Sequence, residues 1–208
     1  MLMGFHSVLT MARSWVLQRL SPGAIAIDAT AGTGVDTQFL AETVGARGAV
    51  YAFDIQPLAL ARTAARLETR FAGEAAADKP EIVLLAQSHA QMLKAIPTSS
   101  HGHISAVMFN LGYLPDPAAD QRIITAHAST LPALEASLEL LRPGGIVTIV
   151  VYPGHPGGEE EADAVTNWAA QLPADRCQSV LYRMPQKTAA PFLIALEKRR
   201  PATLGPTG

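Results

Sequence analysis

The sequence contains little cysteine and little charge, and it has no long apolar run. Its single cysteine among 208 residues, Cys177, excludes an intramolecular disulfide and any cysteine-rich metal site. Charged residues make up only 16% and the formal net charge is -2, so no overall positive field favours a polyanion. No apolar run approaches the roughly 20 residues that cross a bilayer. We therefore expect a soluble, cytoplasmic protein in which any contact with nucleic acid is local.

The two ends of the chain are not expected to carry targeting signals or extra domains. Polar and charged residues interrupt the apolar stretch 1–20, which also lacks a small-residue cleavage site, so we do not expect a signal peptide. A hydrophobic content of 49% suits one buried core, and we predict a single domain over 1–200. The segment 201–208 is predicted to be a disordered tail.

Short apolar runs alternate with longer amphipathic ones, which is the pattern of βαβ units that build a parallel sheet. The runs predicted to be strands covered on both faces are 24–29, 49–53, 82–85, 104–109 and 146–151. Helical spacing is found at 37–44, 57–71, 89–95, 130–141 and 159–172. Two more strands, around 178–182 and 192–197, are joined by a hairpin, so the last strand should be antiparallel. We predict a Rossmann-like α/β fold of the class I methyltransferase type, with a seven-stranded, mostly parallel sheet and helices on both faces.

A glycine-rich segment, Asp-Ala-Thr-Ala-Gly-Thr-Gly, follows the first predicted strand at 28–34. Gly32 and Gly34 let the backbone turn sharply and approach a ligand closely. The helix that begins beyond them offers unpaired N–H groups and a positive dipole end. We predict that this turn, including Thr30 and Thr33, binds a cofactor.

Asp54 ends the second predicted strand, about twenty residues beyond the turn, where a carboxylate can accept hydrogen bonds from both ribose hydroxyls of an adenosine. We assign it to the ribose, and its neighbours Ile55 and Gln56 to the same site. A dinucleotide motif would need glycine or alanine at position 37, where this chain has Thr37, which we place in the cofactor site. The pattern therefore favours S-adenosylmethionine over NAD, and over a turn with no ligand.

Four more polar residues near the turn keep two interpretations each. Asp28 could bond local amides, but we place it close to the methionine amine of the cofactor. Asp36 could equally cap its helix or contact the cofactor. Ser88 and His89, after the third strand, lie where adenine would be approached, although Ser88 also suits an N-cap and His89 could be exposed. All four are included in the predicted cofactor site.

The fourth predicted strand ends in Asn-Leu-Gly-Tyr-Leu-Pro at 110–115, and its first residue should project into the crevice where open α/β sheets bind ligands. The Asn110 side-chain oxygen and the Leu111 carbonyl can accept hydrogen bonds from an amine and so aim its lone pair, which is catalysis by orientation. Asn110 cannot itself be the base. Tyr113 could stack on a planar substrate, although an aromatic there could simply close the strand. We assign Tyr113 and Pro115 to substrate binding.

The loop after the fifth strand should open on the same rim. Tyr152 and His155 are predicted to contact the substrate, and His155 could also accept a proton or contact a phosphate, although a loop histidine is as often merely exposed. The acidic run at 159–161 is interpreted only as a complement to the helix dipole. His101 and His103 lack companions at metal-ligand spacing, so we predict no metal site.

Four segments together resemble one small bacterial family of rRNA-methylase proteins. They are DATAGTGVDT at 28–37, YAFDIQ at 51–56, FNLGYLP at 109–115 and VVYPGHP at 150–156. The similarity covers about 14–198, and the family includes tRNA 5-aminomethyl-2-thiouridine methyltransferases. The resemblance implies a class I methyltransferase fold, S-adenosylmethionine, and methylation of the aminomethyl group on the wobble uridine of tRNA. It agrees with the amine geometry inferred at Asn110, where Leu-Gly replaces the two prolines of the Asn-Pro-Pro-Tyr motif of amino-group methyltransferases.

The chain departs from the family pattern in places. Thr33 and Val35 stand where the family commonly has asparagine and histidine, and Pro153 stands where a histidine is frequent. Asp116-Pro117 replaces an expected glycine and lysine, whereas Thr125 and Thr130 match family threonines.

Three functions therefore remain open. The first is methylation of an exocyclic amine of tRNA, in which a homodimer could combine two modest basic patches, since the basic candidates are scattered. The second is methylation of a small-molecule amine or an rRNA base. The third is a non-catalytic module that binds S-adenosylmethionine. The scattered basic candidates are Arg13, Arg19, Arg122, Arg183 and Lys187.

Overall fold

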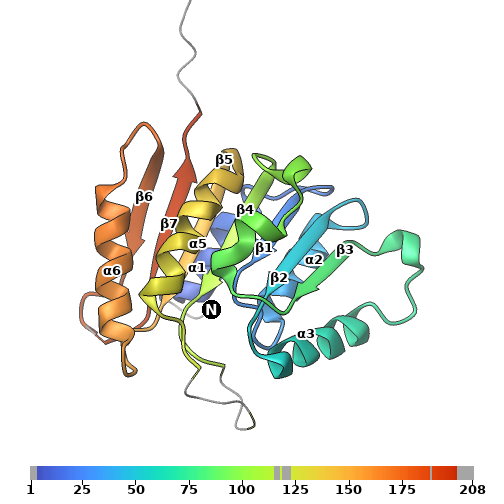
Figure 1. Ribbon diagram of the computed structural model, residues 1–208, viewed down its shortest axis with the longest axis horizontal. Helices are drawn as coiled ribbons and strands as arrows, with labels where there is room; N and C mark the ends of the chain where they lie inside the picture. The colour runs from blue at the N-terminus through green and yellow to red at the C-terminus, as the bar shows by residue number, and fades with distance from the viewer. Residues whose placement is uncertain (1–3, 115–117, 119–122, 188, 201–208) are drawn as a thin grey trace, which may run out of the picture.

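The computed structural model describes residues 4–114, 118, 123–187 and 189–200. Within them, one sheet of seven strands has the order β3-β2-β1-β4-β5-β7-β6 (Figure 1). The strands are β1 (Ile25–Asp28), β2 (Ala49–Phe53), β3 (Glu81–Leu85), β4 (Ile104–Asn110), β5 (Leu141–Val151), β6 (Cys177–Tyr182) and β7 (Phe192–Lys198). Strands β1 to β5 pair in parallel, and β7 is antiparallel to both β5 and β6. The predicted sheet, with its antiparallel last strand, is confirmed.

Helices cover both faces of this sheet. The α-helices are α1 (Val8–Leu17), α2 (Val35–Val44), α3 (Pro57–Arg70), α4 (Met92–Ala95), α5 (His127–Leu140) and α6 (Gly158–Gln171). Short 3-10 turns occur at Ala76–Asp78, His89–Gln91 and Thr98–Ser100. Helices α1, α2 and α3 pack on one face, and α4, α5 and α6 on the other. Along β4, Ala106 and Met108 pack toward α1, α2 and α3, whereas Val107 and Phe109 pack toward α4, α5 and α6. Because both faces are covered, this strand is apolar without alternation.

The structure adds one helix that the sequence analysis did not predict, and it moves some boundaries. In α1, Ser7 caps the helix by accepting the Thr10 N–H, and Ala12 and Val16 are buried one turn apart. The segment predicted as a helix at 89–95 is a 3-10 turn followed by the short α4. Strand β5 begins at Leu141 rather than 146, because the residues after α5 already pair with β4.

The glycine turn fixes how α2 leaves the sheet. Gly34 is the N-cap of α2 with φ 79°, a left-handed conformation that side chains rarely adopt. A Cβ at this position would lie 2.8 Å from the Thr63 Cα, so α2 and α3 could not approach as they do. This turn therefore sets both the ligand-facing backbone and the packing of two helices.

Helices in the described part of the chain are all too short, or too polar, to span a bilayer. The predicted tail 201–208 and the predicted substrate residue Pro115 lie outside the described residues.

Candidate active site

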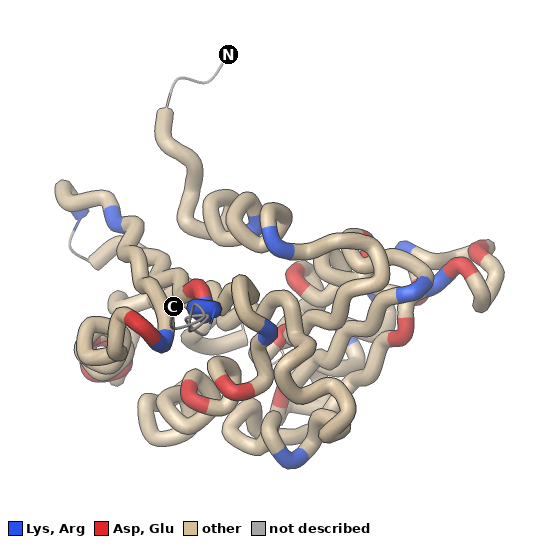
Figure 2. The backbone as a smooth tube through the Cα atoms, turned by 90° about the horizontal axis from the view of Figure 1, so that it is seen from above, with Lys and Arg blue, Asp and Glu red and all other residues tan. Residues whose placement is uncertain are grey.

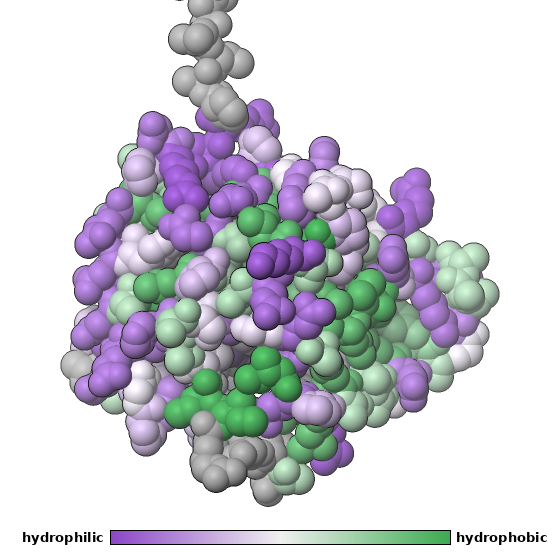
Figure 3. All heavy atoms as spheres, viewed as in Figure 1, coloured by the Kyte–Doolittle hydropathy of each residue, from purple (hydrophilic) through white to green (hydrophobic). Residues whose placement is uncertain are grey.

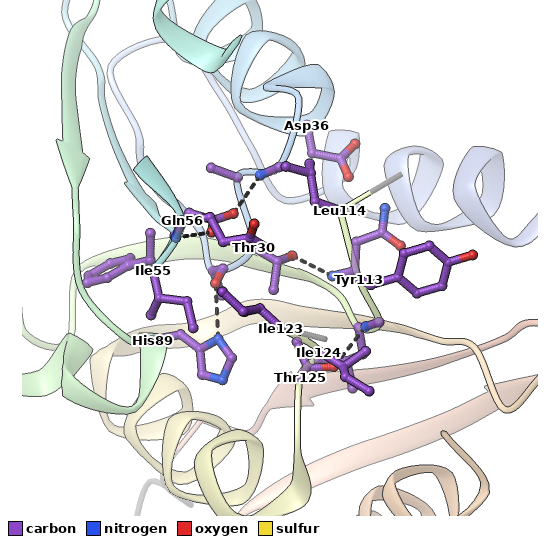
Figure 4. Close-up of a pocket in the computed structure, with 18 of the residues that line it drawn as sticks. Thr30, Asp36, Ile55, Gln56, His89, Tyr113, Leu114, Ile123, Ile124 and Thr125 are labelled. Carbon is purple, nitrogen blue, oxygen red and sulfur yellow. Dashed lines mark hydrogen bonds between the residues drawn. The ribbon is translucent and has the colours of Figure 1, made fainter. Parts of the chain in front are cut away.

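A cavity of about 540 Å³ opens at the carboxyl ends of the parallel strands (Figure 4). Its wall is built from the segments 29–33, 53–56, 87–89, 110–114 and 123–125. Two residues each from α1, α2 and the loop after β5, and one from α5, complete it. This is the place where open α/β sheets bind ligands. In the view of Figure 3, apolar surface is gathered at the lower edge of the molecule, where the parallel strands end.

Most of the predicted site residues that the structure describes lie in this wall, and three of them do not. Those in the wall are Thr30, Gly32, Thr33, Asp36, Asp54, Ile55, Gln56, Ser88, His89, Asn110, Leu111, Tyr113, Tyr152 and His155. Asp28, Gly34 and Thr37 are behind the wall formed by the described residues. In Figure 4, Ile55, Gln56 and His89 lie on one side of the cavity, and Asp36 and Tyr113 lie on the other.

Asp28 holds the backbone of the glycine turn from the side away from the cavity. Its carboxylate is 1% exposed and accepts hydrogen bonds from the Thr30 N–H (3.1 Å) and the Thr37 hydroxyl (2.6 Å). Burial, and next the nearby charge of Asp36, raise its pKa to about 7. The structure therefore gives Asp28 the local partners that were the alternative interpretation, and its contact with the cofactor stays a prediction.

Asp54 links the end of β2 to the same turn. Its Oδ2 accepts the Gly32 N–H at 3.0 Å, and its Oδ1 accepts the Gln56 N–H at 2.9 Å. Each carboxylate oxygen has lone pairs for more than one hydrogen bond, so both can also accept from ribose hydroxyls. The side chain lies in the cavity wall, as a ribose-binding acid requires.

The structure bears differently on the two interpretations given for Ser88 and for His89. Ser88 caps the 3-10 turn by accepting the Ala90 N–H, and it also lines the cavity, where its contact with the cofactor stays a prediction. His89 is buried, not exposed, and its Nδ1 lies 3.2 Å from the Ala29 carbonyl oxygen. Because that oxygen can only accept, Nδ1 carries the proton and Nε2 presents a lone pair. Burial lowers the pKa of His89 and favours this neutral form.

The asparagine at the end of β4 is held by its backbone and has an unpaired side-chain oxygen. The Asn110 N–H donates to the Thr30 hydroxyl at 2.8 Å, which joins the β4 end to the glycine turn. Among the described residues, Asn110 Oδ1 and His89 Nε2 are buried acceptors with no partner. Leaving such atoms unpaired costs about 1–3 kcal/mol each, so the cavity favours a ligand that carries N–H donors.

The loop that follows Asn110 forms the rim. Gly112 has φ 137°, its N–H donates to the Thr125 hydroxyl at 2.8 Å, and its carbonyl accepts the Thr125 N–H at 2.8 Å. Tyr113 is 49% exposed, and its ring meets the His155 ring edge-on at 6.0 Å. Tyr152 is half-buried, and burial raises the pKa of its hydroxyl. The loops after β4 and β5 therefore meet at one rim, as predicted.

Asp36 does not cap α2, because Gly34 holds that position. Its Oδ1 instead accepts hydrogen bonds from Arg13 Nε (3.0 Å) and Nη2 (2.7 Å), and both residues line the cavity. From the sequence, Arg13 was predicted only as one of several scattered basic residues. The apolar Ala12 and Val16, spaced one helical turn apart in the sequence, were the signal that could have predicted α1 and so placed Arg13.

All three acids at 159–161 lie in the first turn of α6, as predicted, but the helix dipole is not the whole role of the third. Glu159 and Glu160 are exposed, but Glu161 is buried and accepts hydrogen bonds from the Thr125 and Thr130 hydroxyls at 2.7 and 2.6 Å. The signal was its helical spacing, because Glu161 shares a face of α6 with the buried Val165 and Ala169.

Charged side chains suggest neither a metal centre nor a single strong basic patch. Among the described residues no cluster of histidine, cysteine and carboxylate side chains could hold a metal ion. Figure 2 shows lysine and arginine residues spread over several elements.

Comparisons with known proteins agree on the family. Residues 50–197 match the family model described as "Putative rRNA methylase". The chain is 35% identical over 187 residues to the chloroplastic tRNA (mnm(5)s(2)U34)-methyltransferase of Arabidopsis thaliana, covering 88% of this chain and 66% of that protein's length.

Two solved structures resemble nearly the whole chain. A Clostridium thermocellum protein of the same family description has a TM-score of 0.84 at 32% identity, covering 94% of this chain and all of the other (100%). A Streptococcus mutans protein solved in complex with SAH has a TM-score of 0.79 at 34% identity, covering 94% of this chain and 99% of the other.

S-adenosylmethionine is the cofactor of this chain, and the cavity has the chemistry to hold it. Asp54 presents a carboxylate in the wall, His89 Nε2 and Asn110 Oδ1 are buried unpaired acceptors, and Gly32 lies in the wall at the turn.

Proposed function

Because the chain belongs to this rRNA-methylase family of S-adenosylmethionine-dependent methyltransferases, we propose that it methylates an exocyclic amine of tRNA. The proposed acceptor is the aminomethyl group of 5-aminomethyl-2-thiouridine at the wobble position. The name of the Arabidopsis relative supports this substrate, although the chain spans only 66% of that relative's length.

The observation that carries the proposal is the unpaired, buried Oδ1 of Asn110 at the end of β4. One N–H of the amine can donate to this oxygen, and a second can donate to the Leu111 carbonyl. The two contacts together hold the lone pair of the amine nitrogen in one direction. The bound cofactor supplies a methyl group on a positively charged sulfur. What the chain contributes is orientation, which can account for several kcal/mol of a barrier.

The acceptor must be a neutral amine, and the nitrogen sheds a proton in the reaction. His155 Nδ1 lies 3.0 Å from the Pro156 carbonyl oxygen, so Nδ1 carries a proton and Nε2 presents a lone pair. That Nε2 lies 3.7 Å from the point where a Cβ of Gly112 would be, beside the Asn110–Leu114 loop. We assign His155 as the proton acceptor.

The rim suits a planar base. Tyr113 presents a half-exposed ring, supported edge-on by His155, at an open and partly apolar mouth. Single-stranded RNA is commonly bound by stacking its unpaired bases on such rings, and the wobble nucleotide lies in an anticodon loop.

A small-molecule amine is the second candidate, because a formal charge of -2 and dispersed basic residues would suit an uncharged substrate. The two candidates share the site and differ only in what binds at the rim.

The test is Asn110→Ala with Asn167→Ala as its matched control, since Asn167 is exposed on α6. We expect Asn110→Ala to reduce methyl transfer about a hundredfold or more while S-adenosylhomocysteine still binds, and Asn167→Ala to behave like the unmodified chain. Unchanged turnover in Asn110→Ala would remove this residue from the mechanism.

A further inference from the structure

Glu161 is a buried carboxylate that joins three segments of chain. It is 1% exposed and lies in the first turn of α6. One carboxylate oxygen, Oε2, accepts the Thr125 hydroxyl at 2.7 Å, and the other, Oε1, accepts the Thr130 hydroxyl at 2.6 Å. Thr125 lies in the cavity wall, whereas Thr130 lies in α5 outside it.

The contact with Glu161 decides which way the Thr125 hydroxyl points. A carboxylate can only accept, so the Thr125 hydrogen is directed at Glu161. The Thr125 oxygen is then left to accept, and it accepts the Gly112 N–H at 2.8 Å (Figure 4). The hydrogen bonds therefore run in one direction. The Gly112 N–H donates to the Thr125 hydroxyl, and that hydroxyl donates to the Glu161 carboxylate.

This series ends on the loop that holds the proposed acceptor groups for the amine. Gly112 follows Asn110 and Leu111 and has φ 137°, a conformation that the chain must hold in place. Its two hydrogen bonds with Thr125 fix it, and the adjacent Tyr113 pairs with Ile124. Any loosening of Thr125 would therefore move the Leu111 carbonyl and the Tyr113 ring.

We propose that Glu161 is a positioning residue for methyl transfer, which acts through Thr125 on the 110–114 loop without touching substrate or cofactor. The proposal rests on the proposed function for its effect on turnover, but its structural part can be measured without any substrate. A conformational error of about 1 Å in such a loop can cost a hundredfold in rate.

The two hydrogen bonds of Glu161 provide the matched comparison. Thr125→Val removes the hydrogen bond that leads to the 110–114 loop, and Thr130→Val removes the hydrogen bond to α5. Both variants take one hydroxyl away from the same carboxylate, and the Thr130 hydroxyl is the more buried, so a purely structural role predicts at least as large an effect for Thr130→Val. Glu161→Gln can still accept the Thr125 hydroxyl through its amide oxygen, whereas Glu161→Ala cannot.

The experiment is amide hydrogen exchange of Gly112 by NMR, together with kcat, KM and the Kd for S-adenosylhomocysteine. We expect Glu161→Ala and Thr125→Val to speed Gly112 exchange at least tenfold and to lower kcat at least tenfold, with the Kd within about twofold. Thr130→Val and Glu161→Gln should keep the Gly112 protection and most of kcat.

Equal loss of Gly112 protection in Thr125→Val and Thr130→Val would overturn the proposal, as would an unchanged kcat in Thr125→Val. If Glu161→Ala does not fold, the two threonine variants carry the same test. If the unmodified chain transfers no methyl group to tRNA, the proposed substrate is wrong. The Gly112 exchange pattern still decides whether Glu161 positions the 110–114 loop through Thr125.

Discussion

The Thr37 hydroxyl donates to the carboxylate of Asp28 across 2.6 Å, from the first turns of α2 back to the last residue of β1. Both residues are buried beneath the glycine turn, so this contact closes the turn from the side away from the cavity. The acid at the end of β1 therefore shapes the cofactor site by holding the backbone, and its titration should be felt in the stability of the fold.

The first prediction concerns pH. The pKa of Asp28 is about 7 in the folded chain against 3.8 when exposed, so the folded state binds a proton more tightly than the unfolded state. This contribution to stability is present below about pH 4 and is lost as the pH rises through 7. We expect Asp28→Asn to flatten the fall in the free energy of unfolding between pH 4 and 7, measured by denaturant titration. Asp175→Asn, on the surface, should leave that slope as it is, and an equal slope in both variants would show that Asp28 is not the titrating group.

A second prediction separates backbone strain from packing at the glycine turn. Gly34 and Gly73 both have φ 79°, but a Cβ at Gly34 would lie 2.8 Å from the Thr63 Cα while the space around Gly73 is open. Alanine at either position costs about 1–2 kcal/mol for the left-handed conformation. Gly34→Ala should cost at least about 2 kcal/mol more than Gly73→Ala in denaturant unfolding, because α2 and α3 must separate. Similar losses in the two variants would mean that the helices adjust freely.

A third prediction concerns which end of the cofactor meets α1. Arg13 and Asp36 form an ion pair in the cavity wall, opposite Ile55, Gln56 and His89. The amino-acid end of S-adenosylhomocysteine carries both a carboxylate and an ammonium group, which complement this pair. We expect Arg13→Met to weaken S-adenosylhomocysteine binding about tenfold by calorimetry, as the loss of one charge-assisted hydrogen bond would.

The control ligand for that prediction is 5′-methylthioadenosine, which lacks the amino-acid end. Its affinity should change less than about twofold in Arg13→Met. Arg19→Met, which removes an arginine paired with Glu197 instead, should affect neither ligand. If both ligands lose affinity equally in Arg13→Met, Arg13 shapes the cavity and does not bind the amino-acid end.

The sheet could be predicted from the sequence because β1, β2, β4 and β5 are buried on both faces, and the hairpin after α6 marked the antiparallel strand. The edge strand β3, also predicted to be covered on both faces, is only partly buried. The cavity wall followed from one rule, that the carboxyl ends of parallel strands meet. Thr30, Asp54 and Asn110 could therefore be placed together although they are far apart along the chain.

What escaped prediction depends on contacts across the fold. Glu161 resembled its exposed neighbours until its face of α6 was known. Asp28 has its partner nine positions later, at Thr37, and nothing local indicates that the hydroxyl turns back to it. The helix α1 was missed because only Ala12 and Val16 are fully buried in it, and the other apolar side chains on that face, Val8, Met11 and Trp15, are only partly buried.

We propose that the cavity methylates an amine on tRNA, and nucleoside mass spectrometry can show this. Unmodified chain, labelled S-adenosylmethionine and tRNA from a strain that lacks this methylation would be incubated, and the tRNA digested to nucleosides. We expect label in the methylaminomethyl form of the wobble 2-thiouridine, and none in that nucleoside with Asn110→Ala. Label found only in rRNA or in a small metabolite would rule out tRNA as the substrate.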